Sequence, residues 1–329
     1  MEWDETEANR KRVQVMNGMK TEGDGVLIID PTDFPKQGKS SVGVARQYSG
    51  SLGKVANCQV TVNCDYAERT LAWPVTSRLY LPETWANDAG RREKAHVPGD
   101  IIFRTKAEIA LGLIDEANQI DVRHTCVVAD AEFGDNPLFL DGLEARHERY
   151  TADVRRDFQV SKARATSTEV LRAEILVAGL RPNAWRIIRW REGTAGWLKG
   201  SFAAIRCWRV DGRGKRTIGW LIAERELPEG SGRNKLHWSN FPASTPRERM
   251  VELVHRRVFI ELYHEDAKTL LGWDQYQGRL WQGFHRNTFL ITPGVAFSFL
   301  VWTEWNERQL VMLPGRPRGA LSPSEGSTT

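Results

Sequence analysis

The chain has 329 residues, of which 41% are hydrophobic and 27% are charged, and its formal net charge is +4. This length and balance predict a water-soluble globular protein with a substantial core. The apolar runs are too short for a membrane helix and the N-terminus lacks the apolar segment of a secretory signal, so no membrane partner is expected. The four cysteines form no CxxC pair, which favours a reducing cytoplasm over a disulfide framework or a structural zinc site.

The first half of the chain has the pattern of an α/β core. Residues 1–24 are polar with a weak apolar stripe and are expected to form a short N-terminal helical segment. Residues 25–156 mix short apolar strands with amphipathic helices, which predicts the first part of a mixed sheet with flanking helices. Pro74 predicts a bulge or an edge in one strand. The expected strands cover 26–30, 58–64, 70–82 and 123–130, and the expected helices cover 106–118 and 138–149.

Residues 157–240 differ from this core, because short alternating runs are separated by glycine, proline and Asp-Gly turns. The pattern predicts a β-rich insertion with a hairpin turn at Asp211-Gly212. Residues 181–225 carry eleven Lys and Arg against three acidic residues, a local charge of +8, together with five tryptophans. Arginine interleaved with aromatic residues suits a surface that binds phosphates and stacks on bases. One solvated face of an antiparallel sheet would have the same composition.

Residues 241–312 return to a helical pattern. A Thr-Pro-Arg-Glu capping box predicts a helix over 245–271, which Gly272 ends. A second helix, apolar enough to be buried, is expected over about 287–309. The last residues, 313–329, are rich in Pro, Gly and Ser and are expected to form a disordered tail.

Two of the predicted strands end on acidic residues, Asp30 and Asp130. If these strands are neighbours in one sheet, both carboxylates lie at the same edge and within reach of each other. On the predicted long helix, Arg257, Glu261 and Lys268 share one face because of their spacing. This face is either a solvated stripe of ion pairs or the place from which Glu261 supplies a third carboxylate to the two aspartates.

A cluster of three carboxylates predicts a metal site. The carboxylates repel one another and raise one another's pKa values unless cations are bound. Oxygen ligands without clustered cysteine or histidine favour Mg²⁺ or Mn²⁺ over Zn²⁺. Two such ions can activate a nucleophile and stabilise the leaving oxygen in phosphodiester cleavage, while Lys and Arg hold DNA phosphates. A two-carboxylate glycoside hydrolase is a second class that the acids allow, although it does not account for the basic insertion.

Four separated stretches occur in an order typical of one protein family. They read VLIIDPTDFPKQGKSSVGVARQYSGSLGKVANCQV at 26–60, ADAEFGDNPLFLDGL at 129–143, WREGTAGWLKGSFAAIR at 190–206 and HRRVFIELYHEDAKTLLGWDQYQGRLWQGFHRN at 255–287. Together they resemble the first block, the second block, the insertion and the third block of DDE-type bacterial insertion-sequence transposases, and most closely those of the insertion sequence 701 family.

The resemblance implies an RNase H-like catalytic core carrying a β-rich insertion, in an endonuclease that cleaves and transfers DNA strands at the ends of a mobile element. By position, Asp30, Asp130 and Glu261 are the catalytic and metal-binding acids, with Mg²⁺ or Mn²⁺, as two ions, for the cofactor. The implied partners are DNA, as terminal inverted repeats and target DNA, and a second copy of the chain that forms a homodimer on DNA in the bacterial cytoplasm, at the nucleoid. The residues expected to contact DNA are Lys36, Lys39, Arg46, Arg189, Arg191, Arg257, Lys268, Arg279 and His285.

The chain departs from the family pattern in its third block and at its start. The family's helix signature of Tyr, Arg, Glu and Lys maps onto Arg257, Glu261 and Lys268, with Val254 in the position of the tyrosine. The phosphate contact of that tyrosine is therefore in question. The region before the first block is shorter than in relatives. The alternative function is therefore a truncated derivative that binds DNA, or a full-length transposase, without cleaving.

A further departure lies in the first block. Relatives often carry a second acid directly after the first, where this chain has Pro31. Asp33 is therefore an alternative metal ligand to Asp30, although Asp30 directly follows the apolar run of the predicted strand.

Overall fold

The computed structural model of the chain describes residues 5–18, 23–68, 71–163, 169–193, 196–225 and 234–312. The chain divides into two compact units, one made of residues 1–149 and 256–299 and the other of residues 150–255 and 300–329. The predicted disordered tail, 313–329, lies outside the described residues. Among the helices of the described ranges, none combines the length and the hydropathy that crossing a membrane requires.

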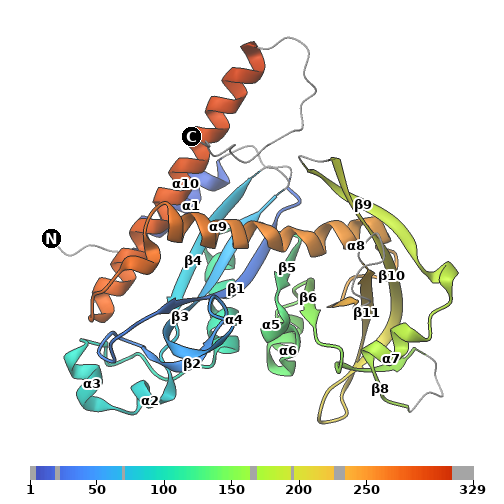
Figure 1. Cartoon of the computed structure of the whole chain (residues 1–329), viewed down its shortest axis with the longest axis horizontal. Coiled ribbons are helices and arrows are strands. Elements are labelled where there is room, and N and C mark those ends of the chain that lie inside the picture. The colour runs from blue at the N-terminus through green and yellow to red at the C-terminus, as the bar shows by residue number, and fades with distance from the viewer. Residues whose placement is uncertain are drawn as a thin grey trace. The chain divides into compact units, whose positions relative to one another are not determined.

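The first unit is built on a mixed sheet of five strands (Figure 1). The strands are β1 (Val26–Pro35), β2 (Ala45–Ser49), β3 (Lys54–Ala67), β4 (Ala72–Leu79) and β5 (Cys126–Ala129). β3 pairs in antiparallel fashion with β1, β2 and β4, whereas β5 is parallel to β1. A register shift in β3 opposite Pro74 confirms the predicted bulge. The apolar runs of β1 and β5 are buried on both faces, as expected for strands inside a sheet covered by helices.

Helices cover both faces of this sheet. They are α1 (Glu5–Asn17), α2 (Glu83–Ala86), α3 (Ala89–Lys94), α4 (Lys106–Gln119), α5 (Ala131–Gly134), α6 (Pro137–Ala145), α9 (Val258–Thr269) and α10 (Trp281–Met312), the last of which runs on past the unit's final residue. Glu116 of α4 accepts a hydrogen bond from Thr76, and Thr76 pairs with Cys64. Asn63, the next residue along β3, contacts His264 of α9 instead. Since neighbouring residues of a strand point to opposite faces, α4 and α9 lie on opposite sides of the sheet. Figure 1 shows α9 crossing in front of the strands and α4 behind them.

Strand β1 is longer than the sequence predicted, because it continues through the two prolines to Pro35. Asp30 therefore lies inside the strand and does not end it. The pairing of β1 with β5 stops at Ile29↔Ala129, whereas its pairing with β3 continues to Pro35. Proline is tolerated where one side of a strand no longer has a partner, which explains why Pro31 does not end β1.

The second unit is an antiparallel sheet with short helices. Its strands are β6 (Tyr150–Val154), β7 (Gln159–Lys162), β8 (Leu171–Arg172), β9 (Arg186–Gly193), β10 (Gly196–Val210), β11 (Arg216–Arg225) and β12 (Lys235–Ser239). They pair in the order β6-β12-β11-β10-β7-β8, and β9 pairs with β10. The β10–β11 hairpin turns at Asp211, whose side chain accepts hydrogen bonds from the backbone of Arg213 and Lys215. The β-rich insertion and its hairpin turn are therefore confirmed.

The second unit is wider than the predicted insertion, 157–240. β6 starts at Tyr150 and pairs with β12, which draws it into the sheet of the second unit. Helix α8 (Arg247–Val254) packs on β6 and β9, so the unit continues to His255. The unit also holds helix α7 (Ala173–Ala178) and a short 3-10 turn at Pro182–Ala184.

The predicted helix over 245–271 is two helices. α8 ends at Val254, a 3-10 turn covers His255–Arg257, and α9 then begins. The N-cap residue of α8 is Pro246 and makes no side-chain cap hydrogen bond, so the predicted capping box does not form. Gly272, with φ +65°, takes the left-handed conformation after α9 that the sequence predicted for a helix end.

Candidate active site

The strand register of the first unit places two of the predicted acids together. Ile29 of β1 is paired with Ala129 of β5 as the last pair of the parallel ladder. Asp30 and Asp130 are the next residue of each strand, so they occupy equivalent positions just beyond that pair. Asp130 follows β5 directly and is the N-cap residue of α5, where its Oδ1 accepts hydrogen bonds from the backbone of Glu132 at 3.0 Å and Phe133 at 3.3 Å. These bonds fix the orientation of the Asp130 carboxylate.

The third predicted acid is connected to Asp30 through an arginine. Arg257, the N-cap residue of α9, places its Nη1 2.9 Å from Oδ1 of Asp30 and its Nη2 2.7 Å from Oε1 of Glu261. Arg257 and Glu261 are four residues apart on the helix, as the face predicted from their spacing required. The Asp30 side chain is 12% exposed and that of Glu261 is 54% exposed. The site therefore has one deep carboxylate and one near solvent, joined by a guanidinium.

The electrostatic environment of Asp30 favours the binding of a positive charge. Burial and the carboxylates of Asp130 and Glu261 together raise the pKa of Asp30 to about 8, against the opposing effect of Arg257. A carboxyl group with this pKa holds a proton at neutral pH unless more positive charge approaches. One guanidinium therefore does not balance the three acids.

Two further residues contact Asp30 on the face covered by α9. Asn63 lies directly across from Asp30 in the β1–β3 ladder, and its Nδ2 donates to the Asp30 carbonyl at 3.2 Å. The same nitrogen lies 3.0 Å from Nε2 of His264, while Nδ1 of His264 is 3.7 Å from Oδ2 of Asp30. Because the Asn63 nitrogen is a donor, Nε2 of His264 must accept, which places the ring proton on Nδ1, facing Asp30. Burial lowers the pKa of His264 to about 3, so its ring is neutral.

Sequence reasoning missed both of these residues. His264 could have been predicted from its position three residues after Glu261, which places it on the same helix face. Asn63 carried no such signal, because only the strand register shows that it is paired with Asp30.

A fourth acid lies deeper on the same face of the sheet. Asp65 is two residues from Asn63 on β3 and is 3% exposed. Burial raises its pKa well above the usual range, and the charge of Asp30 adds to this while Arg12 of α1 opposes it. Arg12 itself donates to the carbonyls of Pro74 and Val75. Sequence reasoning did not select Asp65, which lies between Cys64 and Tyr66, directly after the predicted strand 58–64.

The alternative ligand, Asp33, has a different environment. It is an odd number of residues from Asp30, so its side chain points to the opposite face of β1. There it accepts hydrogen bonds from Ser49 and from the backbone and hydroxyl of Ser51, at 3.1 and 2.8 Å for the latter two. Burial alone would raise the pKa of Asp33, but these hydrogen bonds outweigh it and the pKa is lowered. The Asp33 carboxylate is therefore committed to the turn that follows β2.

The predicted DNA-binding lysines nearest the acids are held by backbone carbonyls. Nζ of Lys268 lies 3.1 Å from the carbonyl of Asp33 and over the ring of Phe34. Nζ of Lys36 contacts the carbonyls of Tyr276 and Asp274, the latter at 3.4 Å. Burial lowers the pKa of both lysines. An ammonium group has three donors, so each lysine retains donors beyond these contacts.

The remaining predicted DNA contacts divide between exposed and buried positions. His285 packs against Trp281, its Nδ1 lies 2.9 Å from the Trp281 carbonyl, and burial lowers its pKa to about 4. Its ring is therefore neutral and faces the protein. Val254, which replaces the family tyrosine, is buried at the end of α8. The other predicted residues are exposed on the two units, namely Lys39, Arg46 and Arg279 on the first and Arg189 and Arg191 on the second.

The tryptophans of the basic insertion serve both structure and surface. The ring of Trp190 is stacked on His255 at 3.9 Å, and Arg206 and Arg225 lie over the rings of Trp220 and Trp185. These contacts belong to the fold of the second unit. Trp197, by contrast, is 52% exposed on β10, across from Glu192 on β9. The composition of this segment thus reflects packing as well as an exposed basic surface.

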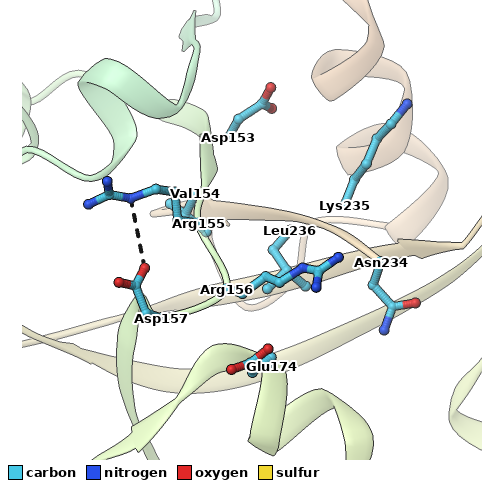
Figure 2. A pocket seen from close by; sticks show the side chains of 9 residues that line it. All are labelled: Asp153, Val154, Arg155, Arg156, Asp157, Glu174, Asn234, Lys235 and Leu236. Atoms are coloured by element: carbon cyan, nitrogen blue, oxygen red, sulfur yellow. Dashed lines mark ion pairs between the residues drawn. The ribbon is translucent and has the colours of Figure 1, made fainter. Parts of the chain in front are cut away.

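The second unit also contains an open cavity of about 580 Å³ (Figure 2). Acids and cations alternate around it, and Arg155 is 3.8 Å from Asp157. None of the predicted site residues lines it. The lining residues are Asp153, Val154, Arg155, Arg156, Asp157, Glu174, Asn234, Lys235 and Leu236.

The predicted acids fit a hard divalent cation by chemistry. Their donors are all carboxylate oxygens, which Mg²⁺ and Mn²⁺ prefer, and the raised pKa of Asp30 shows that the cluster lacks positive charge. Within the described part of the chain, no three His, Cys, Asp or Glu side chains converge as a ready metal site. The guanidinium of Arg257 lies between Asp30 and Glu261 instead.

Comparison with known proteins identifies the family. Residues 1–196, more than half of the chain, match the family model described as DDE superfamily endonuclease. The chain belongs to the DDE superfamily of endonucleases. The matched part of this DDE endonuclease contains Asp30 and Asp130, whereas Glu261 lies beyond it.

One curated relative and one solved structure extend the comparison. The chain is 25% identical over 257 residues to the probable transposase for insertion sequence element IS701 of Microchaete diplosiphon. The alignment covers 77% of this chain and 59% of the relative, so the chain spans less than two thirds of the relative's length. The NurA nuclease from Sulfolobus solfataricus matches with a TM-score of 0.36 and 10% identity, over 89% of this chain and 86% of that chain. This structural likeness is too low to bear on the site.

Proposed function

We propose that the chain is a DNA transposase that cleaves phosphodiester bonds and transfers strands at the ends of an insertion sequence. Membership of the DDE endonuclease superfamily and the name of the curated relative support this function. The observation that carries the proposal is the arrangement around Asp30. The β1–β5 register puts Asp130 beside it, and α9 connects it to Glu261 through Arg257.

In the proposed mechanism Asp30, Asp130 and Glu261 hold Mg²⁺ or Mn²⁺, as two ions. When bound, the ions supply the positive charge that activates a nucleophile and stabilises the leaving oxygen. Asp30 must lose its proton, which nearby positive charge favours because the pKa of its carboxyl group is raised to about 8. Asn63 holds the backbone of Asp30, and the ring of His264, which Asn63 contacts, lies beside the Asp30 carboxylate.

Arg257 has two roles in this scheme. While it pairs with Asp30 and Glu261, its guanidinium partly neutralises their charge. With cations held by the three acids, the guanidinium would lie next to the reacting centre and would be placed to bind a DNA phosphate in a bidentate manner. Lys268 and Lys36 would retain their backbone contacts and use their remaining donors toward the phosphate backbone.

The proposed partners are the terminal inverted repeats, target DNA and a second copy of the chain assembled on DNA, in the bacterial cytoplasm. The exposed cations of both units, among them Arg46, Arg189, Arg191 and Arg279, support a DNA-binding surface.

The test is a cleavage assay of the full chain on labelled DNA containing the sequences that flank its coding region, with Mn²⁺ or with a chelator. Cleavage should require Mn²⁺ and should be lost in Asp130→Ala and in Glu261→Ala. Arg146→Ala is the matched control, because Arg146 forms an ion pair with Asp115 in the same unit. Equal cleavage by all three variants would refute the proposed site, and binding without any cleavage would favour the non-cleaving derivative.

A further inference from the structure

A long segment of the first unit carries positive charge only. Residues 34–64 contain the cations Lys36, Lys39, Arg46 and Lys54 and no acidic residue. The segment runs from the end of β1 through the β2–β3 hairpin and along most of β3. Lys36 is buried, whereas Lys39, Arg46 and Lys54 are exposed, and their charge attracts an anionic partner.

Three apolar side chains lie together on the hairpin within this segment. Tyr48 of β2 is paired with Val55 of β3, so both project from the same face of the two-stranded ribbon. Tyr48 is 63% exposed and Val55 is 54% exposed. Leu52, in the turn that joins the strands, is 46% exposed. Single exposed apolar residues are common on protein surfaces, but three adjacent ones at the tip of a hairpin form a patch.

Cations lie beside this patch. Arg46 is two residues before Tyr48 and projects from the same face of the ribbon, whereas the exposed Lys54 directly precedes Val55 and leaves from the opposite face. The preceding loop is tied to the ribbon, because Nδ2 of Asn57 donates to the carbonyls of Lys36 at 2.8 Å and Gly38 at 2.7 Å. The loop that carries Lys39 therefore lies against the same hairpin.

The tip of the hairpin is preorganised by Asp33. Its carboxylate accepts hydrogen bonds from Ser49 at the end of β2 and from Ser51 in the turn. The turn closes at Gly53, which has φ +62° and so takes a conformation that L side chains rarely adopt. The buried Asp33 thus holds the turn of the β2–β3 hairpin in one conformation. This order reduces the conformational entropy that the hairpin would lose on binding.

We propose that the β2–β3 hairpin is a DNA-contacting element that recognises unpaired or unstacked bases. Tyr48 stacks on an accessible base, Leu52 and Val55 pack beside it, and Arg46 and Lys54 hold the adjacent phosphates. Aromatic and aliphatic side chains contact bases in this way where a strand is single or a base step is opened. The charge of the segment selects DNA over an apolar protein partner. The proposal rests on the proposed function for its substrate, since DNA ends become unpaired during cleavage and strand transfer.

The test compares two fluorescent DNA probes bound by the full chain in a chelator, so that no cleavage occurs. One probe is a duplex, and the other is the same duplex with unpaired bases at one end. The chain should bind the forked probe more tightly. Tyr48→Ala should weaken binding to the forked probe by about fivefold to a hundredfold, as expected for the loss of one stacked base. Leu52→Ala should weaken it less, because Leu52 packs beside the base, and both variants should change duplex binding little. Tyr48→Phe should retain the preference because it keeps the ring.

Two further variants separate the contributions. Arg46→Ala should weaken the binding of both probes and reduce its dependence on salt, because a phosphate contact releases counterions irrespective of sequence. Leu138→Ala is the matched control, since Leu138 is 66% exposed on α6 and outside the hairpin. It should bind both probes as the unmodified chain does.

Two outcomes would overturn the proposal. One is a forked-probe preference that survives both Tyr48→Ala and Leu52→Ala. The other is a change in oligomeric state caused by these variants in the absence of DNA, which would make the hairpin a contact between copies of the chain. Both measurements use binding alone, so they stand apart from the cleavage assay of Asp130→Ala and Glu261→Ala that tests the active site.

Discussion

Nη1 of Arg257 lies 2.9 Å from Oδ1 of Asp30, in a position where a bound cation would also neutralise that carboxylate. The other terminal nitrogen, Nη2, is 2.7 Å from Glu261, so one side chain connects two of the three acids of the site. The guanidinium favours the ionised form of Asp30, which is the form that binds a divalent ion. The charge state of Asp30 is therefore a measurable property of the site.

The first prediction concerns the removal of that guanidinium. Arg257 lowers the pKa of Asp30, which is nevertheless raised to about 8 by burial. In Arg257→Ala the pH at which Mn²⁺ binding is half complete should rise by about 1 unit or more, because Asp30 then holds its proton more tightly. Electron paramagnetic resonance of free Mn²⁺ measures this binding without DNA. Arg146→Ala should show no such shift, and an unchanged midpoint in Arg257→Ala would contradict the assigned coupling.

The second prediction is a pH dependence of stability. Because the pKa of Asp30 is raised from its ordinary value to about 8, the folded chain binds a proton that the unfolded chain releases. Asp30 therefore lowers the free energy of unfolding progressively as the pH rises from about 4 to about 8. Asp30→Asn removes this loss and should be more stable than the unmodified chain at pH 8, by up to about 5 kcal/mol. Thermal unfolding followed across that pH range measures the difference, and parallel curves for the two proteins would show that Asp30 is charged when folded.

The third prediction concerns the contact of His264 with Asn63 and Asp30. His264→Asn keeps a donor near the position of Nδ1, which faces Asp30, whereas His264→Gln keeps a group only near Nε2, which faces Asn63. If the pair positions Asp30, Mn²⁺ affinity should fall by about tenfold or more in His264→Ala and should recover more in His264→Asn than in His264→Gln. Calorimetric titration with Mn²⁺ measures each affinity. Equal losses in all three variants would mean that His264 contributes only packing.

The fourth prediction concerns a buried charge network in the second unit. Nδ1 of His237 is 2.7 Å from Oδ1 of Asp153, and Nε2 is 3.7 Å from Glu224. Although burial opposes it, the hydrogen bond to Asp153 and the nearby carboxylate of Glu224 raise the pKa of His237 to about 9. The resulting stabilisation is fully present below the unfolded pKa of about 6.5 and is lost as the pH rises through about 9.

Replacement of one member should therefore expose the network. His237→Gln should destabilise the second unit by about 3 kcal/mol, since it leaves the buried Glu224 and the half-buried Asp153 without the charge of His237. Hydrogen exchange of peptides from β11 and β12 should accelerate below pH 9, and the difference from the unmodified chain should shrink above it. Asp157→Asn is the control, because its ion pair with Arg155 is exposed. Faster exchange in the control as well would point to a general loosening of the unit.

The fifth prediction uses two glycines of the same unit. A Cβ added at Gly219 of β11 would lie 2.3 Å from Cζ2 of Trp238 and 2.5 Å from the carbonyl of Ser239, whereas one added at Gly212 would meet nothing within 4 Å. Gly219→Ala should lower the free energy of unfolding by about 1–3 kcal/mol, because β11 and β12 must separate to admit it. Gly212→Ala should change it by less than about 0.5 kcal/mol. Chemical denaturation followed by tryptophan fluorescence distinguishes the two variants, and equal stabilities would show that the strands yield easily at Gly219.

The sequence was informative wherever local pattern decides structure. Local sequence patterns indicated the two apolar strands that precede Asp30 and Asp130. The spacing of about four residues indicated the helix face that carries Glu261. The Asp-Gly turn and the bulge at Pro74 followed from the chemistry of single residues. These features gave the mixed sheet, the β-rich insertion and the three candidate acids.

The rest depended on contacts between distant residues. Asn63 carries no local signal, and its role depends on a register that joins β1 to β3. The break between α8 and α9 was missed because the residues from His255 to Arg257 fit a continuous helical pattern, yet they form a 3-10 turn. The sequence allowed Asp33 as an alternative metal ligand. Its carboxylate instead accepts hydrogen bonds from Ser49 and Ser51, which only the structure shows.

The position of Asp130 depends on the number of residues in the short strand β5. It has only four residues, and its ladder with β1 ends one residue before both aspartates. A single-residue insertion or deletion within β5 would shift Asp130 to the other face of the sheet while leaving the apolar character of the strand intact. Conservative substitutions of its buried residues would cost only packing. Under the proposed function, small frame-preserving insertions and deletions here would separate copies that can cleave DNA from copies that only fold.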